Sequence, residues 1–151
     1  MARIGVPTGP EWLKIARAEI GVKEIPGPKH HPRILDYLST VAKGRHKKDE
    51  IPWCSAFVNW CMIRDLKLGT DEALARSWLQ WGKPLDIPQL GCIVVMRRGT
   101  SSWQGHVGFW LGELEPAWFH CLGGNQKDSV RVSRYATSKV LGYRWPEVAA
   151  W

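Results

Sequence analysis

The chain has 151 residues and a mass of 17.2 kDa, which predicts one domain spanning residues 1–151. Hydrophobic residues make up 44% and charged residues 23% of the sequence, and these values exclude a wholly disordered or collagen-like chain. The longest aliphatic run, residues 93–96, is far shorter than the ~20 residues needed to span a bilayer. The net charge of +7 indicates attraction to polyanions: nucleic acid, anionic lipid or an acidic cell-wall polymer.

The first seven residues contain no apolar segment of the kind found in secretory signals. The sequence therefore predicts synthesis in a cytoplasm without a signal peptide. In that reducing compartment the four cysteines are expected to be free thiols. No Cys-x-x-Cys motif is present, and the spacing of Cys54 and Cys61 is poor for zinc, so no metal is predicted.

The first half of the sequence has the period of helices. Apolar residues recur on one face over residues 12–20, and after a Pro-Gly-Pro break a second helix is expected over 32–41. A polar loop is expected over 43–50. A third helix then runs from Cys54 to about Leu66, and a shorter fourth helix covers roughly 71–81.

The second half has the pattern of short strands. Five are predicted, with a hairpin turn at 113–116 between the second and the third: residues 91–96, 106–111, 117–122, 130–135 and 140–145. Helices followed by consecutive strands predict an α+β domain in which N-terminal helices pack on a C-terminal antiparallel sheet.

Cys54 stands out among the cysteines because it is expected to begin the third helix. The positive end of the helix dipole favours the thiolate, which is the nucleophilic form of cysteine. Cys61, Cys92 and Cys121 have apolar neighbours and are predicted to lie in the core.

A cysteine nucleophile needs a base, and His106 at the start of a predicted strand is the candidate. The base in turn needs an orienting group. Asn125 follows two glycines, and His120 lies in the neighbouring strand; the register of the hairpin decides whether His120 shares a face with His106. From spacing alone, each of these residues could equally be structural.

Four segments together resemble the CHAP and NlpC/P60 group of cysteine peptidoglycan hydrolases, and most closely single-domain phage endolysins. The resemblance runs from about Trp12 to Trp145, and the segments are Trp53-Cys-Ser-Ala-Phe-Val-Asn-Trp60, Gly91-Cys-Ile-Val-Val95, Gly105-His-Val-Gly-Phe109 and Gly123-Gly-Asn-Gln126. The order, with cysteine before histidine, is that of papain-like folds.

The resemblance implies hydrolysis of an amide bond in the bacterial stem peptide, without a cofactor. Cys54 would attack the carbonyl carbon, His106 would transfer the proton, and Asn125 would orient His106, with His120 as the alternative third residue. Members of the CHAP family often carry a glutamate two residues before that asparagine, where this chain has Gly123.

Two tryptophans are candidates for a substrate groove: Trp53 beside the nucleophile and Trp103 in the loop before His106. The predicted partner is bacterial peptidoglycan, with a possible attraction to anionic membrane surfaces and no obligate protein partner. The expected setting is lysis of a host cell by a protein that reaches the cell wall after release from the cytoplasm.

Two other functions fit the same sequence. A cysteine amidase or transferase toxin, delivered to competing bacteria, would use the same residues on another target. A non-catalytic wall-binding module would need only the basic charge and the tryptophans. No nucleic-acid motif or extended basic helix is present, so no nucleic acid is predicted as a partner.

Overall fold

The computed structural model describes residues 9–25, 30–41 and 53–147. Helices come first: α1 (Glu11–Ala18), α2 (Pro32–Leu38), α3 (Cys54–Arg64) and the 3-10 helix η2 (Ala75–Gln80). The strands follow, with a short 3-10 helix η3 (Thr137–Lys139) before the last: β1 (Lys83–Leu85), β2 (Ile93–Arg97), β3 (Gly105–Glu115), β4 (Trp118–Gln126), β5 (Ser129–Ala136) and β6 (Val140–Trp145). The predicted α+β class is confirmed.

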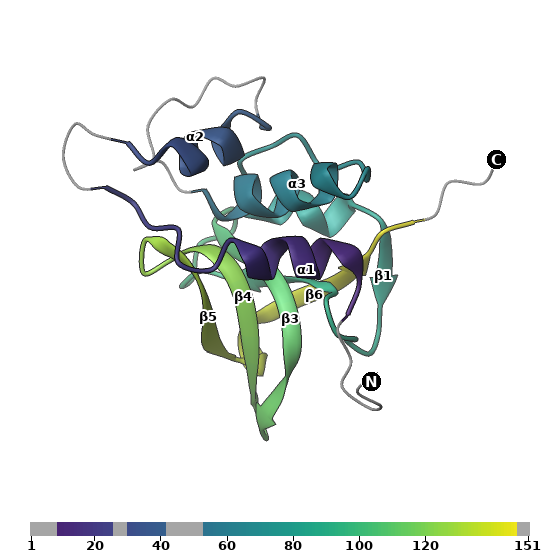
Figure 1. Ribbon diagram of the computed structural model, residues 1–151. Coiled ribbons are helices and arrows are strands. Elements are labelled where there is room, and N and C mark those ends of the chain that lie inside the picture. Colours follow the sequence, from purple (N-terminus) through teal and green to yellow (C-terminus); the bar gives the residue numbers. More distant parts are fainter. Residues whose placement is uncertain (1–8, 26–29, 42–52, 148–151) are drawn as a thin grey trace, which may run out of the picture.

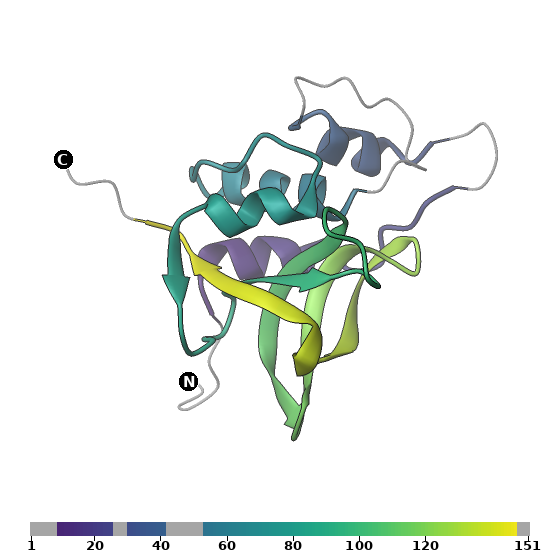
Figure 2. The ribbon, with the colours of Figure 1, turned by 180° about the vertical axis from the view of Figure 1, so that it is seen from behind.

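The strands form one antiparallel sheet of six, in the order β1-β6-β2-β3-β4-β5. Figure 1 shows α1, α2 and α3 gathered on one side of this sheet, while the tip of the β3–β4 hairpin projects away from them. Seen from behind, β6 runs along the sheet toward β1 at its edge (Figure 2). The start of β3 and the end of β4 thus lie at the end of the hairpin nearer the helices.

Helix α3 is the central helix of the fold. Every residue from Cys54 to Met62 is buried, as expected for a helix whose apolar residues surround its axis. The Ser55 hydroxyl donates to the carbonyl oxygen of Glu72 (2.6 Å) and accepts from Trp78 Nε1 (2.8 Å). These bonds hold the first turn of α3 in place, because a buried polar group left without a partner is costly.

A buried aromatic and charged cluster fixes the residue that precedes α3. The Trp53 ring stacks on Tyr37 of α2 at 5.8 Å between ring centroids, and its Nε1 donates to Glu24 Oε1 (2.7 Å). Tyr37 itself donates to Glu19, which also pairs with Arg33 (3.0 Å). The chain therefore enters α3 along one path, set by contacts from α1 and α2.

Several predicted elements differ in extent. The predicted helix over 71–81 is the shorter 3-10 helix η2, because Asp71 has a positive φ of 64° and Leu74 is extended. The hairpin turn lies later than predicted: β3 continues to Glu115, and Ala117 in the turn has a φ of 72°. The second helix ends at Leu38, and the three-residue strand β1 was not predicted. The predicted loop over 43–50 lies outside the described residues.

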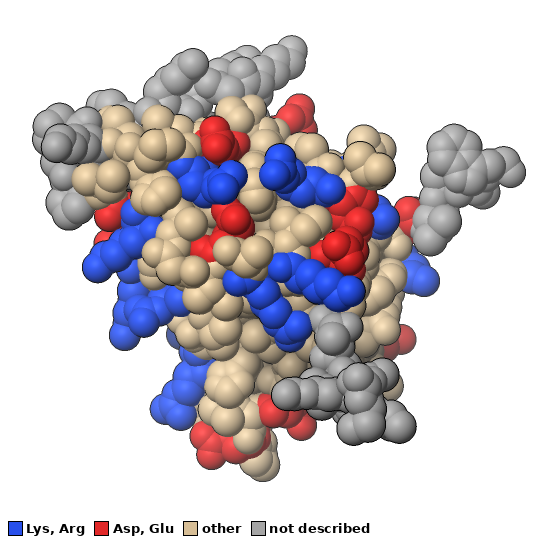
Figure 3. Space-filling model, in the orientation of Figure 1, with Lys and Arg blue, Asp and Glu red and all other residues tan. Residues whose placement is uncertain are grey.

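Charged side chains of both signs cover the surface. Figure 3 shows Lys and Arg spread over one face and interspersed with Asp and Glu, as the dispersed basic residues of the sequence suggest. In the described ranges, no helix combines the length and apolarity that crossing a membrane requires.

The contact between β4 and α3 gives a first prediction. A Cβ atom at Gly124 would lie 2.7 Å from both Phe57 Cβ and Trp53 Cζ3. The Gly124→Ala change should lower the free energy of unfolding by about 1–3 kcal/mol, because overpacking forces the helix and the strand apart. Urea denaturation followed by circular dichroism measures this loss.

Gly142→Ala is the matched control, because its Cβ would meet only the end of the Leu79 side chain, at 3.1 Å. Equal stability of the two variants would contradict close packing of β4 on α3.

Candidate active site

Cys54 is the first residue of α3, and its thiol is almost fully buried, with 6% of the residue exposed. Two backbone N–H groups, from Ser55 and Val107, point at its sulfur. The first N–H groups of a helix have no partner within the helix and carry the positive end of its dipole. The surroundings of the sulfur are therefore suited to a negative charge.

His106 lies at the start of β3, where it pairs with Met96 of β2. Its side chain forms hydrogen bonds with Cys54 and, through Nε2, with Gln126 Oε1 at 2.8 Å. Because Nε2 faces Gln126, Nδ1 is the ring nitrogen available to the thiol. The ring also lies 5.4 Å from that of Tyr135 on β5. The structure thus brings Cys54 and His106 together, as predicted from the sequence.

The two groups shift each other's pKa in opposite directions. Burial alone would raise the pKa of Cys54, but the charge and hydrogen bond of His106, with the N–H groups of Val107 and Ser55, lower it below its usual value. Burial alone would lower the pKa of His106, but the charge and hydrogen bond of Cys54 and the bond to Gln126 raise it, against the opposing charge of Arg98. The pair therefore favours a thiolate beside an imidazolium.

Gln126 at the end of β4 holds the imidazole. Its side chain is buried (3% exposed), and its amide Nε2 donates to the carbonyl oxygens of Cys121 (3.2 Å) and Arg131 (2.7 Å). Only the NH₂ end of the amide can serve two carbonyl acceptors, so Oε1 must face His106. An oxygen in that position accepts the Nε2 proton of His106 and so directs Nδ1 toward the thiol.

Gly123 makes room for this contact. A Cβ atom at position 123 would lie 2.5 Å from Gln126 Oε1 and 3.4 Å from His106 Nε2. A side chain at 123 would therefore point at the imidazole and occupy the place of the Gln126 amide.

The predicted third residues lie elsewhere. Asn125 lies beside the site with a φ of 56°, but the hydrogen bond expected from it is made by Gln126. The difference is explained by a β-bulge, which is one extra residue in β4 between Gly123 and Gln126. Because of this residue, Gln126 and not Asn125 lies on the same face of the strand as Gly123. His120 pairs with Gly112, well along the hairpin from His106.

The two tryptophans predicted to line a substrate groove differ in their exposure to solvent. Trp53 is fully buried, so its ring packs in the core and presents no face to a substrate; this corrects the prediction. Trp103 is 61% exposed in the loop before β3, and its role in substrate binding stays a prediction. Cys61, Cys92 and Cys121 are buried, which fits the core positions expected for them.

Sequence reasoning missed Gln126 as a functional residue. The available signal was its place next to Asn125 in the Gly-Gly-Asn-Gln segment, but the resemblance to CHAP enzymes favoured the asparagine. Among the described residues, no three His, Cys, Asp or Glu side chains gather where they could hold a metal ion.

Residues 46–113 match the CHAP domain family. The match contains both Cys54 and His106 and ends before β4, so it does not reach Gln126. A comparison with curated proteins finds no match to the chain. CHAP domains are typically cysteine- and histidine-dependent amidases or endopeptidases of peptidoglycan, which is the class of activity that this match supports.

The ion pair predicts selective alkylation. At neutral pH iodoacetamide should modify the folded protein at Cys54 alone, because burial raises the pKa of Cys61 and Cys121 and raises that of Cys92 to about 12. Mass spectrometry of the peptides identifies the site. His106→Ala should move the pH dependence of the reaction upward, since the imidazolium that stabilises the thiolate is gone. An unchanged pH dependence in this variant would rule out the ion pair.

Gln126 is tested by the same reaction. Gln126→Ala should shift the alkylation midpoint upward by roughly one pH unit, because a hydrogen bond to a charged group contributes about 1.5–3 kcal/mol. Asn125→Gly, which suits the positive φ at that position, is the matched control and should leave the midpoint in place. A shift in the control but not in Gln126→Ala would restore Asn125 as the orienting residue.

Proposed function

We propose that this protein hydrolyses an amide bond in the peptide part of peptidoglycan, with Cys54 as the nucleophile. The observation that carries the proposal is the hydrogen-bonded series Cys54–His106–Gln126, formed where α3 begins beside the start of β3. A nucleophile, a base and a buried group that orients the base are the three parts that cysteine-dependent acyl transfer needs.

The chemistry has two halves. The Cys54 thiolate attacks the carbonyl carbon of the amide, and the resulting tetrahedral intermediate expels the amine as it takes a proton from His106. The product is a thioester between Cys54 and the acyl part of the substrate. Water then attacks the thioester, with neutral His106 accepting its proton, and the carboxylic acid leaves as the thiolate–imidazolium pair forms again.

Backbone N–H groups at the start of α3 support the same chemistry. Ser55, in the first turn of α3, and Val107, in β3, already direct N–H groups at the sulfur, so the space beside it favours negative charge. We assign the stabilisation of the oxyanion to N–H groups of this first turn, where the helix dipole adds to their effect.

The wider setting is proposed on the same basis. A cysteine on a helix followed by a histidine on a strand is the order of papain-like NlpC/P60 folds, and we propose that arrangement here. The role is that of a phage-type endolysin, which is made in the host cytoplasm and acts on the cell wall after release. The net charge of +7 would draw the protein to the anionic wall and to anionic membrane surfaces.

A second candidate uses the same residues. A toxin with amidase or transferase activity would share the Cys54 thioester but pass the acyl group to another acceptor, or attack another target. A wall-binding module without catalysis is favoured less, because binding alone does not require a thiol and an imidazole held together by a buried amide.

Digestion of purified sacculi tests the proposal. The wild-type protein should release fragments with new amine ends, and their masses identify the bond that is cut. Cys54→Ala should abolish this release, because no other group of the series can form the thioester. Liquid chromatography with mass spectrometry measures the products.

Cys92→Ala is the control, since it removes a buried thiol outside the series. It should leave the products unchanged, and circular dichroism should show both variants folded. Equal cleavage by wild type and Cys54→Ala would refute Cys54 as the nucleophile. Intact sacculi with folded wild-type protein would favour the toxin or the binding module.

A further inference from the structure

An open pocket of about 280 Å³ adjoins His106 on the sheet. Segments far apart in the sequence form it: the end of β2 with the loop that follows, the start of β3, the β4–β5 turn, and η3. His106 and Gln126 both contribute to its wall, so its contents lie next to the base of the proposed reaction. The catalytic steps described above make no use of the rest of this pocket.

Among the described residues, four cations and no acidic side chain line the pocket. They come from three of these segments: Arg97 at the end of β2 with Arg98 after it, Lys127 in the β4–β5 turn, and Lys139 in η3. Within the described parts of the chain, none of the four forms a salt bridge. We name this group of side chains with the space between them the cationic pocket.

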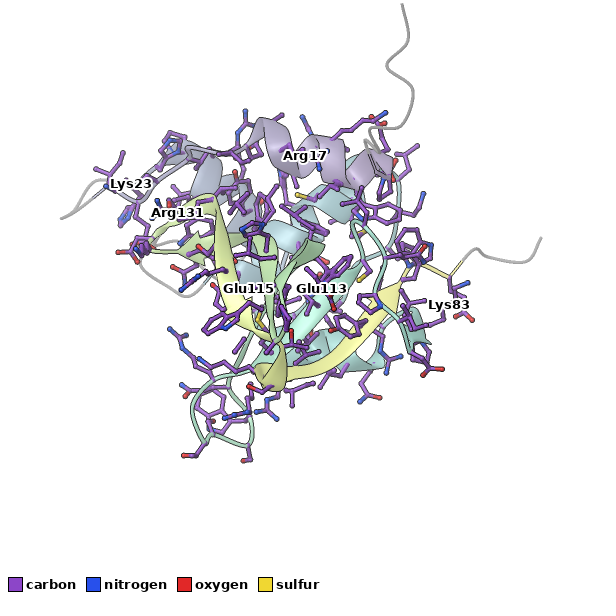
Figure 4. The ribbon with its side chains drawn as sticks, turned by 90° about the horizontal axis from the view of Figure 1, so that it is seen from below. Arg17, Lys23, Lys83, Glu113, Glu115 and Arg131 are labelled. Carbon is purple, nitrogen blue, oxygen red and sulfur yellow. The ribbon has the colours of Figure 1, made fainter. Side chains whose placement is uncertain are left out.

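The salt bridges of the described residues lie outside the cationic pocket. Two arginines elsewhere have acidic partners: Arg33 pairs with Glu19 (3.0 Å) and Arg134 with Glu115 (3.7 Å). Glu113 and Glu115 belong to the projecting part of the hairpin, away from the start of β3 (Figure 4). No acidic side chain of the described residues lines the pocket beside His106.

The charge of Arg98 is felt at the rings of both His106 and Tyr135, which face each other at 5.4 Å. An anion placed among the four cations would offset this charge and would favour the protonated form of His106. Binding of an anion would thus help the residue that gives a proton to the leaving amine.

We propose that the cationic pocket binds a free carboxylate on the same peptide whose amide bond Cys54 attacks. The inference rests on the proposed function and names a part of the substrate. A carboxylate is the anionic group that a peptide can carry within a few bonds of an amide, and it forms strong hydrogen bonds with Arg and Lys. Because His106 is part of both sites, one substrate molecule can reach both.

The size of the pocket supports a side chain or a chain end as the occupant. Its volume of about 280 Å³ lies at or below the range of roughly 300–1,000 Å³ that holds a drug-sized ligand. A carboxylate with a few carbon atoms fits this space, whereas a disaccharide with its peptide does not. The cationic pocket thus selects one acidic group of the substrate.

The test uses synthetic stem peptides in which each carboxylate in turn is free or converted to a primary amide. At one of these carboxylate positions, the wild-type protein should cleave the peptide with the free acid at a lower KM than the peptide with the primary amide. Arg98→Gln and Lys139→Gln should each reduce this preference by about fivefold, which is the effect of one partly exposed charge pair. The ratio of kcat/KM for the acid and the amide is the readout, because it cancels changes in the common chemistry.

Lys83→Gln is the matched control, since it removes an exposed charge from β1, at the opposite edge of the sheet from β5 (Figure 4). It should leave the ratio unchanged. Added salt should reduce the preference of the wild type, because it screens the charges. Added inorganic phosphate at the same ionic strength should inhibit by raising KM for the acid.

Equal cleavage of the acid and the amide at every position would overturn the cationic pocket while leaving the proposed function in place. The cationic pocket is also overturned if Arg98→Gln and Lys139→Gln keep the full preference for the acid. Failure of the wild type to cleave any of these peptides or sacculi would overturn both proposals. Where the wild type does cleave, loss of cleavage in Cys54→Ala shows that the proposed function holds, whatever the result for the cationic pocket.

Discussion

The hydrogen bond between Cys54 and His106 depends on one constraint, which is that the first turn of α3 stays against the start of β3. Neither residue could impose this alone, because a single hydrogen bond contributes only about 1 kcal/mol net. The position is held instead by packing on several sides. Ser55 is bonded to Glu72 and Trp78, Trp53 is stacked on Tyr37, and Gly124 allows β4 to approach. The reactive pair is thus a consequence of a core that surrounds the start of one helix.

The same constraint explains why the residue before the nucleophile is a buried tryptophan. Its indole N–H reaches Glu24, and its ring lies between Tyr37 and the backbone of Gly124. A large, rigid side chain with one polar atom can join α2, the segment after α1, and β4 at one point. Trp53 therefore serves the geometry of Cys54 from inside the core, and contact with a substrate is left to more exposed groups.

His106 has two kinds of neighbour: a neutral amide that holds its ring, and the cations of the cationic pocket. A neutral amide, Gln126, fixes the ring through Oε1 without adding a formal charge, and its own N–H groups are satisfied by Cys121 and Arg131. A neutral partner leaves the charge of the pair to Cys54 and His106 themselves. Apart from His106, the four cations then provide the only formal charges among the described residues that line the cationic pocket, and these suit an acidic part of the substrate.

Much of this protein could be predicted from its sequence, because the deciding signals are local. The helical period before residue 66, the strand patterns after residue 91 and the place of Cys54 at the start of a helix each depend on a few neighbouring residues. The order of Cys54 and His106 also pointed to the CHAP family, which the comparison supports over residues 46–113.

Only the tertiary structure decided which residue contacts His106. A single extra residue in β4 exchanges the sides of Asn125 and Gln126, and nothing in the local pattern marks where such a bulge occurs. The burial of Trp53 and the meeting of Arg98 with Lys139 are also non-local, since each depends on segments that the sheet brings together. Sequence periodicity determines which face of an element is apolar, whereas register and packing determine which polar side chains meet.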